Sequence, residues 1–107
     1  MKVWLDDTRP APPGWVWMTR VRDVIAALRA EEVDEVSLDY NLTQTDPKRD
    51  GLDVLKWLYK HPSCPLPVIH FHTANAWGGA RMAWYWRALE GRCKPTEQAL
   101  LESMGLE

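Results

Sequence analysis

Three carboxylates follow two short apolar segments in a pattern that suits a metal ion. Asp6 and Asp7 come directly after residues 2–5, and Asp39 comes directly after residues 36–38. If both segments are strands of one parallel sheet, the three acids meet at one edge and repel one another unless a cation lies between them. Carboxylate oxygens suit Mg²⁺ or Mn²⁺, and Mg²⁺ also accepts water and phosphate oxygens. An isolated Asp-Asp pair can also simply begin a solvated turn.

A second polar group lies at His70-Phe71-His72, with Thr73 and Asn75 directly after it. Alternation along a strand places both imidazoles on one face. Parallel strands are usually apolar on both faces, so two histidines there need a reason. They could bind a second, softer ion or act as general acid and base on a phosphoester; His70 could equally be a hydrogen-bonded core residue. Thr73 and Asn75 can donate hydrogen bonds to a phosphoryl oxygen.

Cations for a phosphate are available at Arg9, Arg81 and Lys94, although Arg81 also reads as a solvated surface charge. Gly78-Gly79 would let backbone amides approach an anion at the start of a helix. The acids, the histidines and these cations together indicate chemistry on a phosphate.

The elements that must position these residues alternate along the chain. Periodicity predicts four strands, at residues 2–5, 15–18, 36–38 and 68–72. It predicts four helices: one after Thr19, one opened by Gly51, one at 80–89 that stops at Gly91, and a last one at 95–104. Residues 73–79 are predicted to form a loop. Such alternation favours a small three-layer α/β fold of the receiver/flavodoxin-like type. Its parallel sheet would have four strands, or five if residues 91–93 form one. Ligands of such sheets bind at the carboxyl edge of the strands.

Length and composition narrow the class of protein. The chain has 107 residues, 46% hydrophobic and 26% charged, which is the balance of one globular domain. A net charge of −2 gives no general attraction to nucleic acid or lipid. With no signal peptide or membrane-spanning run in the sequence, we expect a cytoplasmic protein whose two cysteines stay reduced. We expect most of the seven tryptophans in the core, with Trp77 in a loop beside the site.

Several of these residues resemble response-regulator receiver domains. The Asp6-Asp7 pair, Asp39 with the following segment, Thr73-Ala74 and Lys94-Pro95 match the receiver pattern. A closer resemblance is to the cyclic-phosphate processing receiver-like family, carried by residues 4–12, Ser37-Leu38-Asp39 and residues 69–75. It runs through most of the first 90 residues and implies one receiver-like domain over 1–107, with a core at about 1–90.

The resemblance implies a metal-dependent phosphodiesterase that hydrolyses a cyclic phosphate of a small molecule or nucleotide. A Mg²⁺ or Mn²⁺ ion would be held by Asp6, Asp7 and Asp39. Among the other groups, His72 would move protons and His70 would orient it or bind metal. Thr73 with Asn75 would stabilise the phosphoryl oxygens, and Arg9 and Lys94 would bind the substrate.

Two other functions stay open on the same residues. In a signalling module, Asp39 would accept a phosphoryl group and Thr73 would follow the new charge. Asn41 keeps this alternative open, because it fits the ordinary receiver, which offers a backbone carbonyl to the metal at that place. In a non-catalytic phosphate-binding or adaptor domain, Trp84-Tyr85-Trp86 would contact another protein.

Overall fold

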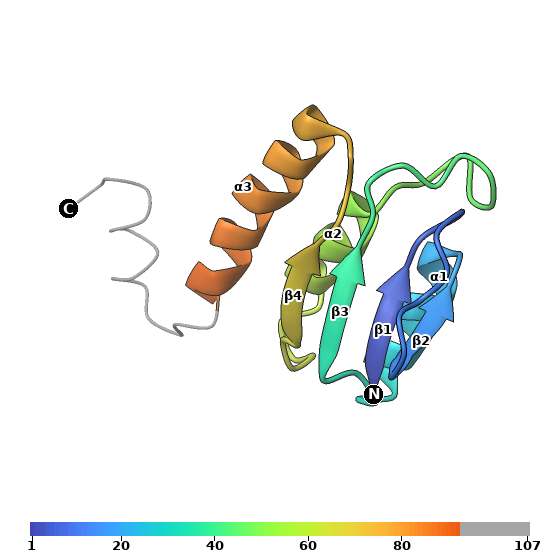
Figure 1. Ribbon diagram of the computed structural model, residues 1–107. Coiled ribbons are helices and arrows are strands. Elements are labelled where there is room, and N and C mark those ends of the chain that lie inside the picture. The colour runs from blue at the N-terminus through green and yellow to red at the C-terminus, as the bar shows by residue number, and fades with distance from the viewer. Residues whose placement is uncertain (93–107) are drawn as a thin grey trace.

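The computed structural model describes residues 1–92, which form a four-stranded sheet and three helices (Figure 1). The elements are β1 (Lys2–Leu5), β2 (Trp15–Met18), α1 (Val21–Arg29), β3 (Glu35–Leu38), α2 (Leu52–Lys60), β4 (Val68–Phe71) and α3 (Ala76–Arg92). All strands are parallel, in the order β2-β1-β3-β4. The predicted receiver-like α/β fold with a parallel sheet is therefore confirmed, with four strands among the described residues.

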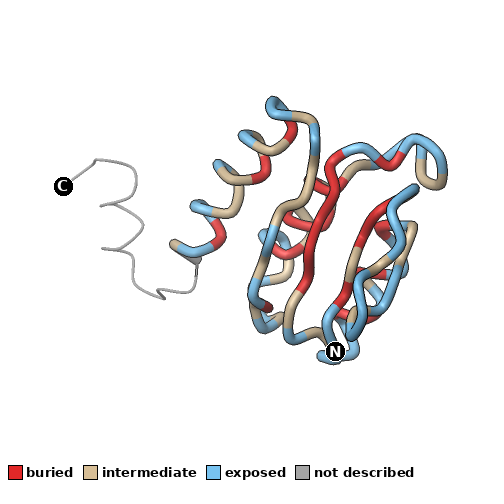
Figure 2. Tube along the Cα trace, in the orientation of Figure 1, coloured by how far each residue is buried: buried red, intermediate tan, exposed pale blue. Residues whose placement is uncertain are grey.

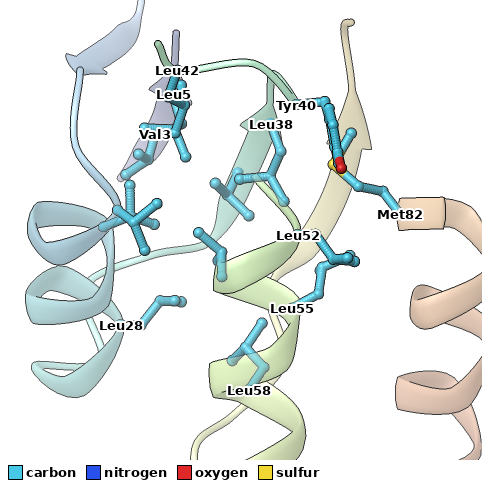
Figure 3. Packing of buried hydrophobic residues seen from close by; sticks show 14 of the residues in the cluster. Val3, Leu5, Leu28, Leu38, Tyr40, Leu42, Leu52, Leu55, Leu58 and Met82 are labelled. Atoms are coloured by element: carbon cyan, nitrogen blue, oxygen red, sulfur yellow. The ribbon is translucent and has the colours of Figure 1, made fainter. Parts of the chain in front are cut away.

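The core lies between one face of the sheet and the helices. The register pairs Val3 with Val36 and Leu5 with Leu38, so these side chains project to the same face. They pack against the apolar stripes of the helices, which include Val24, Leu28, Leu52, Leu55 and Leu58 (Figure 3). Figure 2 shows the buried residues running along β1 and β3 and along the helix sides that face them. Helical periodicity predicts two apolar stripes, Val21, Val24, Ile25 and Leu28 on one helix and Leu52, Leu55, Leu58 and Tyr59 on the other. All of these residues are buried or partly buried except Tyr59, which is 51% exposed.

The opposite face is covered by a loop and aromatic side chains, and none of the three described helices packs on it. The crossover from β1 to β2, residues 6–14, runs over this face, where its Arg9 carbonyl accepts a hydrogen bond from Trp4 Nε1 at 3.0 Å. The Trp4 ring stacks on His72 with centroids 3.6 Å apart, and Trp15 meets Trp4 edge-on at 6.1 Å. The predicted third layer is thus formed here by a proline-rich segment and indole rings.

The expectation that most tryptophans are core residues is wrong. None of the seven is fully buried, and Trp17, Trp77 and Trp84 are 45%, 65% and 69% exposed. The core is filled instead by leucine and valine. Trp4, Trp15 and Trp17 project to the second sheet face, and Trp57 of α2 and Trp86 of α3 pack against the core only in part.

The helix boundaries differ from the predicted ones at both ends of α3. Asn75 Oδ1 accepts the Gly78 N–H at 2.9 Å, and this side-chain cap starts the helix at Ala76 rather than at residue 80. Gly78, Gly79 and Trp77 are therefore helical, and the helix continues through Gly91 to Arg92. Lys94 and the predicted helix 95–104 lie outside the described residues.

The start of α1 is capped from a distant loop. The sequence predicts Thr19 as the N-cap of this helix, but Arg20 occupies the N-cap position and makes no side-chain hydrogen bond to the helix. Asp46 Oδ2 accepts the Val21 N–H at 3.0 Å instead. This contact ties the loop after β3 to α1. None of the described helices is long and apolar enough to cross a membrane.

Candidate active site

The predicted acidic cluster forms at the carboxyl edge of the sheet. Leu5 and Leu38 are paired neighbours, so Asp6 and Asp39 leave adjacent strands side by side, and the Asp39 N–H donates to the Leu5 carbonyl at 2.9 Å. One carboxylate oxygen from each of Asp6, Asp7 and Asp39 lies within 4.8 Å of the other two. Asp6 is completely buried and Asp39 is 6% exposed. Three hard oxygen donors at such spacing fit a divalent ion such as Mg²⁺ or Mn²⁺.

Asp6 is held in place by hydrogen bonds to both of its carboxylate oxygens. Oδ1 accepts the backbone N–H groups of Thr8 and Arg9 at 2.9 and 2.8 Å. Oδ2 accepts a hydrogen bond from His72 Nε2 at 3.0 Å and lies 3.4 Å from Arg9 Nε. Burial alone would raise the pKa of Asp6, but these bonds outweigh it, so the pKa lies below its ordinary value. Asp6 is therefore ionised at neutral pH.

The pKa of Asp39 is shifted in the opposite direction, above its ordinary value. Burial and the neighbouring Asp6 charge raise the pKa of Asp39, and a hydrogen bond from the Thr73 hydroxyl offsets only part of this. The Thr73 oxygen also accepts the Asn75 N–H at 3.1 Å, which fixes the hydroxyl between the helix start and the carboxylate. Two buried carboxyl groups with opposed pKa shifts form a site where a bound cation would favour the ionised forms of both.

The loop after β3 contacts Asp7, the third acid of the site. The Gln44 N–H donates to Asp7 Oδ2 at 3.0 Å, which leaves Asp7 Oδ1 available. Gly51 then returns the chain so tightly that a Cβ there would lie 2.0 Å from the Asp39 carbonyl oxygen. Residues 43–50 read as an ordinary polar loop in the sequence. The sequence predicts Gly51 only as the residue that opens the next helix, so its close approach to Asp39 is a finding of the structure.

His72 supports Asp6 from the aromatic face of the sheet. Its Nδ1 lies 2.6 Å from Ser37 Oγ, and its Nε2 contacts Asp6. Burial lowers the pKa of His72, and the Asp6 charge restores only part of it, so the ring is neutral at pH 7. The neutral tautomer that satisfies both contacts donates from Nε2 to Asp6 and accepts the Ser37 hydroxyl at Nδ1. Ser37 was missed as a site residue, although it shares the strand face of the histidines.

The family model described as the cyclic-phosphate processing receiver domain matches residues 1–88. The chain belongs to this family. No curated protein and no solved structure matches it. The matched residues of this cyclic-phosphate processing receiver domain include all three acids, Ser37, His72 and Thr73, whereas Lys94 lies beyond the match. The family resemblance expected from the sequence is therefore confirmed.

The remaining predicted site residues of this receiver domain take different positions. His70 shares a strand face with His72 as expected, but it is half exposed, 3.7 Å from a Glu35 carboxylate oxygen and edge-on to Trp15. Within residues 1–92 it makes no described contact with the acidic cluster. Asn75 uses its side-chain oxygen to cap α3. Arg9 contacts Asp6 while its side chain stays 53% exposed, so guanidinium N–H groups remain available to an anion.

Proposed function

We propose that this protein hydrolyses a cyclic phosphate, or a related phosphoester, with the help of a divalent metal ion. The observation that carries the proposal is the triad of Asp6, Asp7 and Asp39, two of them buried and one oxygen of each within 4.8 Å of the others, in a member of the cyclic-phosphate processing receiver family. A cyclic phosphodiester has a single negative charge, which an acidic site around one cation can accept.

In the proposed reaction, water attacks phosphorus, one ring P–O bond breaks, and the proton of the water ends on the oxygen that leaves. A cyclic monophosphate gives a phosphomonoester with a new hydroxyl group, and a cyclic oligonucleotide gives its linear form with a terminal phosphate and a new hydroxyl group. A cation bound by the three acids would polarise the phosphoryl group and supply an activated water. Exposed Arg9 would bind the phosphate oxygens.

The supporting residues act on the acids in this proposal. Thr73 holds Asp39 through its hydroxyl, and His72 orients Asp6 through Nε2–H. A proton from His72 would reach the substrate only if this N–H turned away from Asp6. The hydrogen bonds of His72 therefore support a positioning role, with Ser37 fixing its tautomer.

The test is turnover of a substrate panel in Mg²⁺ or Mn²⁺. The panel contains cyclic mononucleotides, cyclic oligonucleotides and terminal cyclic phosphates of RNA. We expect the wild type to open at least one of them, and Asp39→Asn to lose the activity at least about 100-fold. Asp23→Asn, the same charge change on an exposed residue of α1, is the control and should retain full activity. A folded, metal-loaded wild type with no turnover on the panel would refute hydrolysis of these substrates.

A second function is favoured by the contact between Asp39 and Thr73. A receiver-type signalling module would form an acyl phosphate on Asp39, and the Thr73 hydroxyl could move to the new phosphoryl oxygens. Incubation with acetyl phosphate and Mg²⁺ separates the two. Stoichiometric labelling of Asp39, unchanged in His72→Gln, together with no turnover of the panel, would replace the hydrolase by the signalling module.

A further inference from the structure

A hollow of about 340 Å³ lies between α2 and α3. It is lined by Leu52 and Lys56 of α2 and by Trp77, Arg81, Trp84 and Tyr85 of α3. This volume falls in the range of small-molecule sites, which are typically about 300–1,000 Å³ and mostly apolar with a few polar groups. The hollow is separate from the acidic cluster and is not used in the proposed hydrolysis.

The lining combines aromatic faces with positive charge. Trp77 and Trp84 are the two most exposed large hydrophobic residues of the described chain, at 65% and 69%. The Arg81 guanidinium lies 4.7 Å from the Trp77 ring and donates to Tyr40 OH at 2.7 Å. Lys56 makes no described ion pair within residues 1–92. Two indoles beside two cations are complementary to a flat aromatic group attached to an anion.

Both walls of the hollow are linked to the acidic site through Tyr40 and Gly51. On the α3 side, Tyr40 directly follows Asp39, and its ring covers Gly78 so closely that a Cβ there would lie 2.2 Å from the ring. The same ring meets Trp77 edge-on at 6.1 Å. On the α2 side, Leu52 directly follows Gly51, which packs on the Asp39 carbonyl. Tyr40 therefore connects the segment that carries Asp39 with the α3 wall of the hollow, where it contacts Trp77 and Arg81.

We propose that this hollow receives the nucleobase of a nucleotide whose phosphate lies at the acidic cluster. The inference rests on the proposed function, because it names the class of substrate for the same site. The base would stack on Trp84, and Lys56 with Arg81 would face the anionic part of the ligand. Sequence-tolerant stacking of this kind needs no hydrogen-bond code for the base.

Two phosphomonoesters, which have no ring P–O bond to open, test the inference. Adenosine 3′-monophosphate carries a base, and glycerol phosphate does not; their affinities are measured by calorimetry in Mg²⁺. Stacking on one aromatic residue corresponds to about 5- to 150-fold in affinity. We therefore expect the nucleotide to bind the wild type tighter by that factor, and Trp84→Ala to remove the difference while the affinity for glycerol phosphate stays unchanged. Trp84 is exposed, so its removal should leave the fold intact.

Val68→Ala provides the control, since Val68 is an exposed hydrophobic residue of β4 outside the lining and its loss should leave both affinities unchanged. Equal affinity of the two ligands for the wild type would overturn the nucleobase site but leave the acidic site standing. Failure of both ligands to bind would instead count against the proposed function and the inference together. A dimer in sedimentation that dissociates in Trp84→Ala would also overturn the inference, because a second copy of the chain would then occupy the hollow.

Discussion

Neutralising Asp39 should stabilise the metal-free protein. Its carboxylate lies within 4.8 Å of that of Asp6, where two unit charges repel by about 0.9 kcal/mol at the dielectric constant of water and about 3.5 kcal/mol at an effective value of about 20. In Asp39→Asn this repulsion is removed, and the amide oxygen still accepts the Thr73 hydroxyl through a weaker neutral bond. We expect the free energy of unfolding in EDTA at pH 7 to rise by about 1–2 kcal/mol.

Urea unfolding followed by circular dichroism measures this change, and Mg²⁺ should reverse the order of the two proteins. A ligand at 100 times its dissociation constant stabilises the folded state by about 2.7 kcal/mol, and only the wild type keeps all three carboxylates. Asp23→Asn serves as the surface control and should change stability by less than about 0.5 kcal/mol. The reasoning is refuted if Asp39→Asn is less stable than wild type in EDTA, or if Mg²⁺ stabilises both equally.

Further predictions concern the groups that hold the acids. Gly51→Ala should destabilise the protein by at least about 2 kcal/mol in a urea titration and weaken Mg²⁺ binding, because the new Cβ collides with the Asp39 carbonyl. Gly91 has open space around it and a helical backbone, so Gly91→Ala should raise the free energy of unfolding by about 0.5–1 kcal/mol in the same titration. Because the pKa of His72 is lowered in the folded protein, the unfolded chain binds a proton at this residue more readily. His72 therefore stabilises the fold above about pH 6.5 and loses that contribution on acidification. The pKa of Asp39 is raised, so the contribution of Asp39 to stability increases on acidification. Unfolding midpoints between pH 7 and pH 5 should therefore rise more on acidification in His72→Gln than in wild type, and parallel curves would contradict this. Trp4→Leu should cost about 1–3 kcal/mol through the lost stacking on His72 and the lost bond to the Arg9 carbonyl, and an unchanged urea midpoint would show that this stack contributes nothing.

The acidic cluster was predictable because topology alone determines it. Once residues 2–5 and 36–38 are strands of one parallel sheet, Asp6 and Asp39 must leave the same edge, whatever the details of packing. The apolar stripes of α1 and α2 followed from helical periodicity in the same way. These features depend on local patterns and on the handedness of crossovers, both of which can be read from a single chain.

Contacts between distant side chains could not be predicted in this way. The bond between Ser37 and His72 depends on the pairing of β3 with β4, which the sequence does not specify. The contacts of Asp46 with the start of α1 and of Gln44 with Asp7 depend on how the loop after β3 folds back, which periodicity does not predict. The start of α3 was placed too late because Gly78 and Gly79 read as a loop. The cap from Asn75 and the Tyr40 ring over Gly78 outweigh the low helix propensity of glycine there.

The proline-rich crossover of residues 6–14 has a consequence for how the chain tolerates change. Surface loops of α/β proteins commonly accept insertions, because they neither cover the core nor hold the site. This one does both: it lies over the second sheet face through Trp4 and wraps Asp6 with two backbone N–H groups. Lengthening it by even a few residues would loosen the sheet and the acidic site together, whereas the exposed turn at residues 62–63 touches neither and is the better place to graft a tag or a domain.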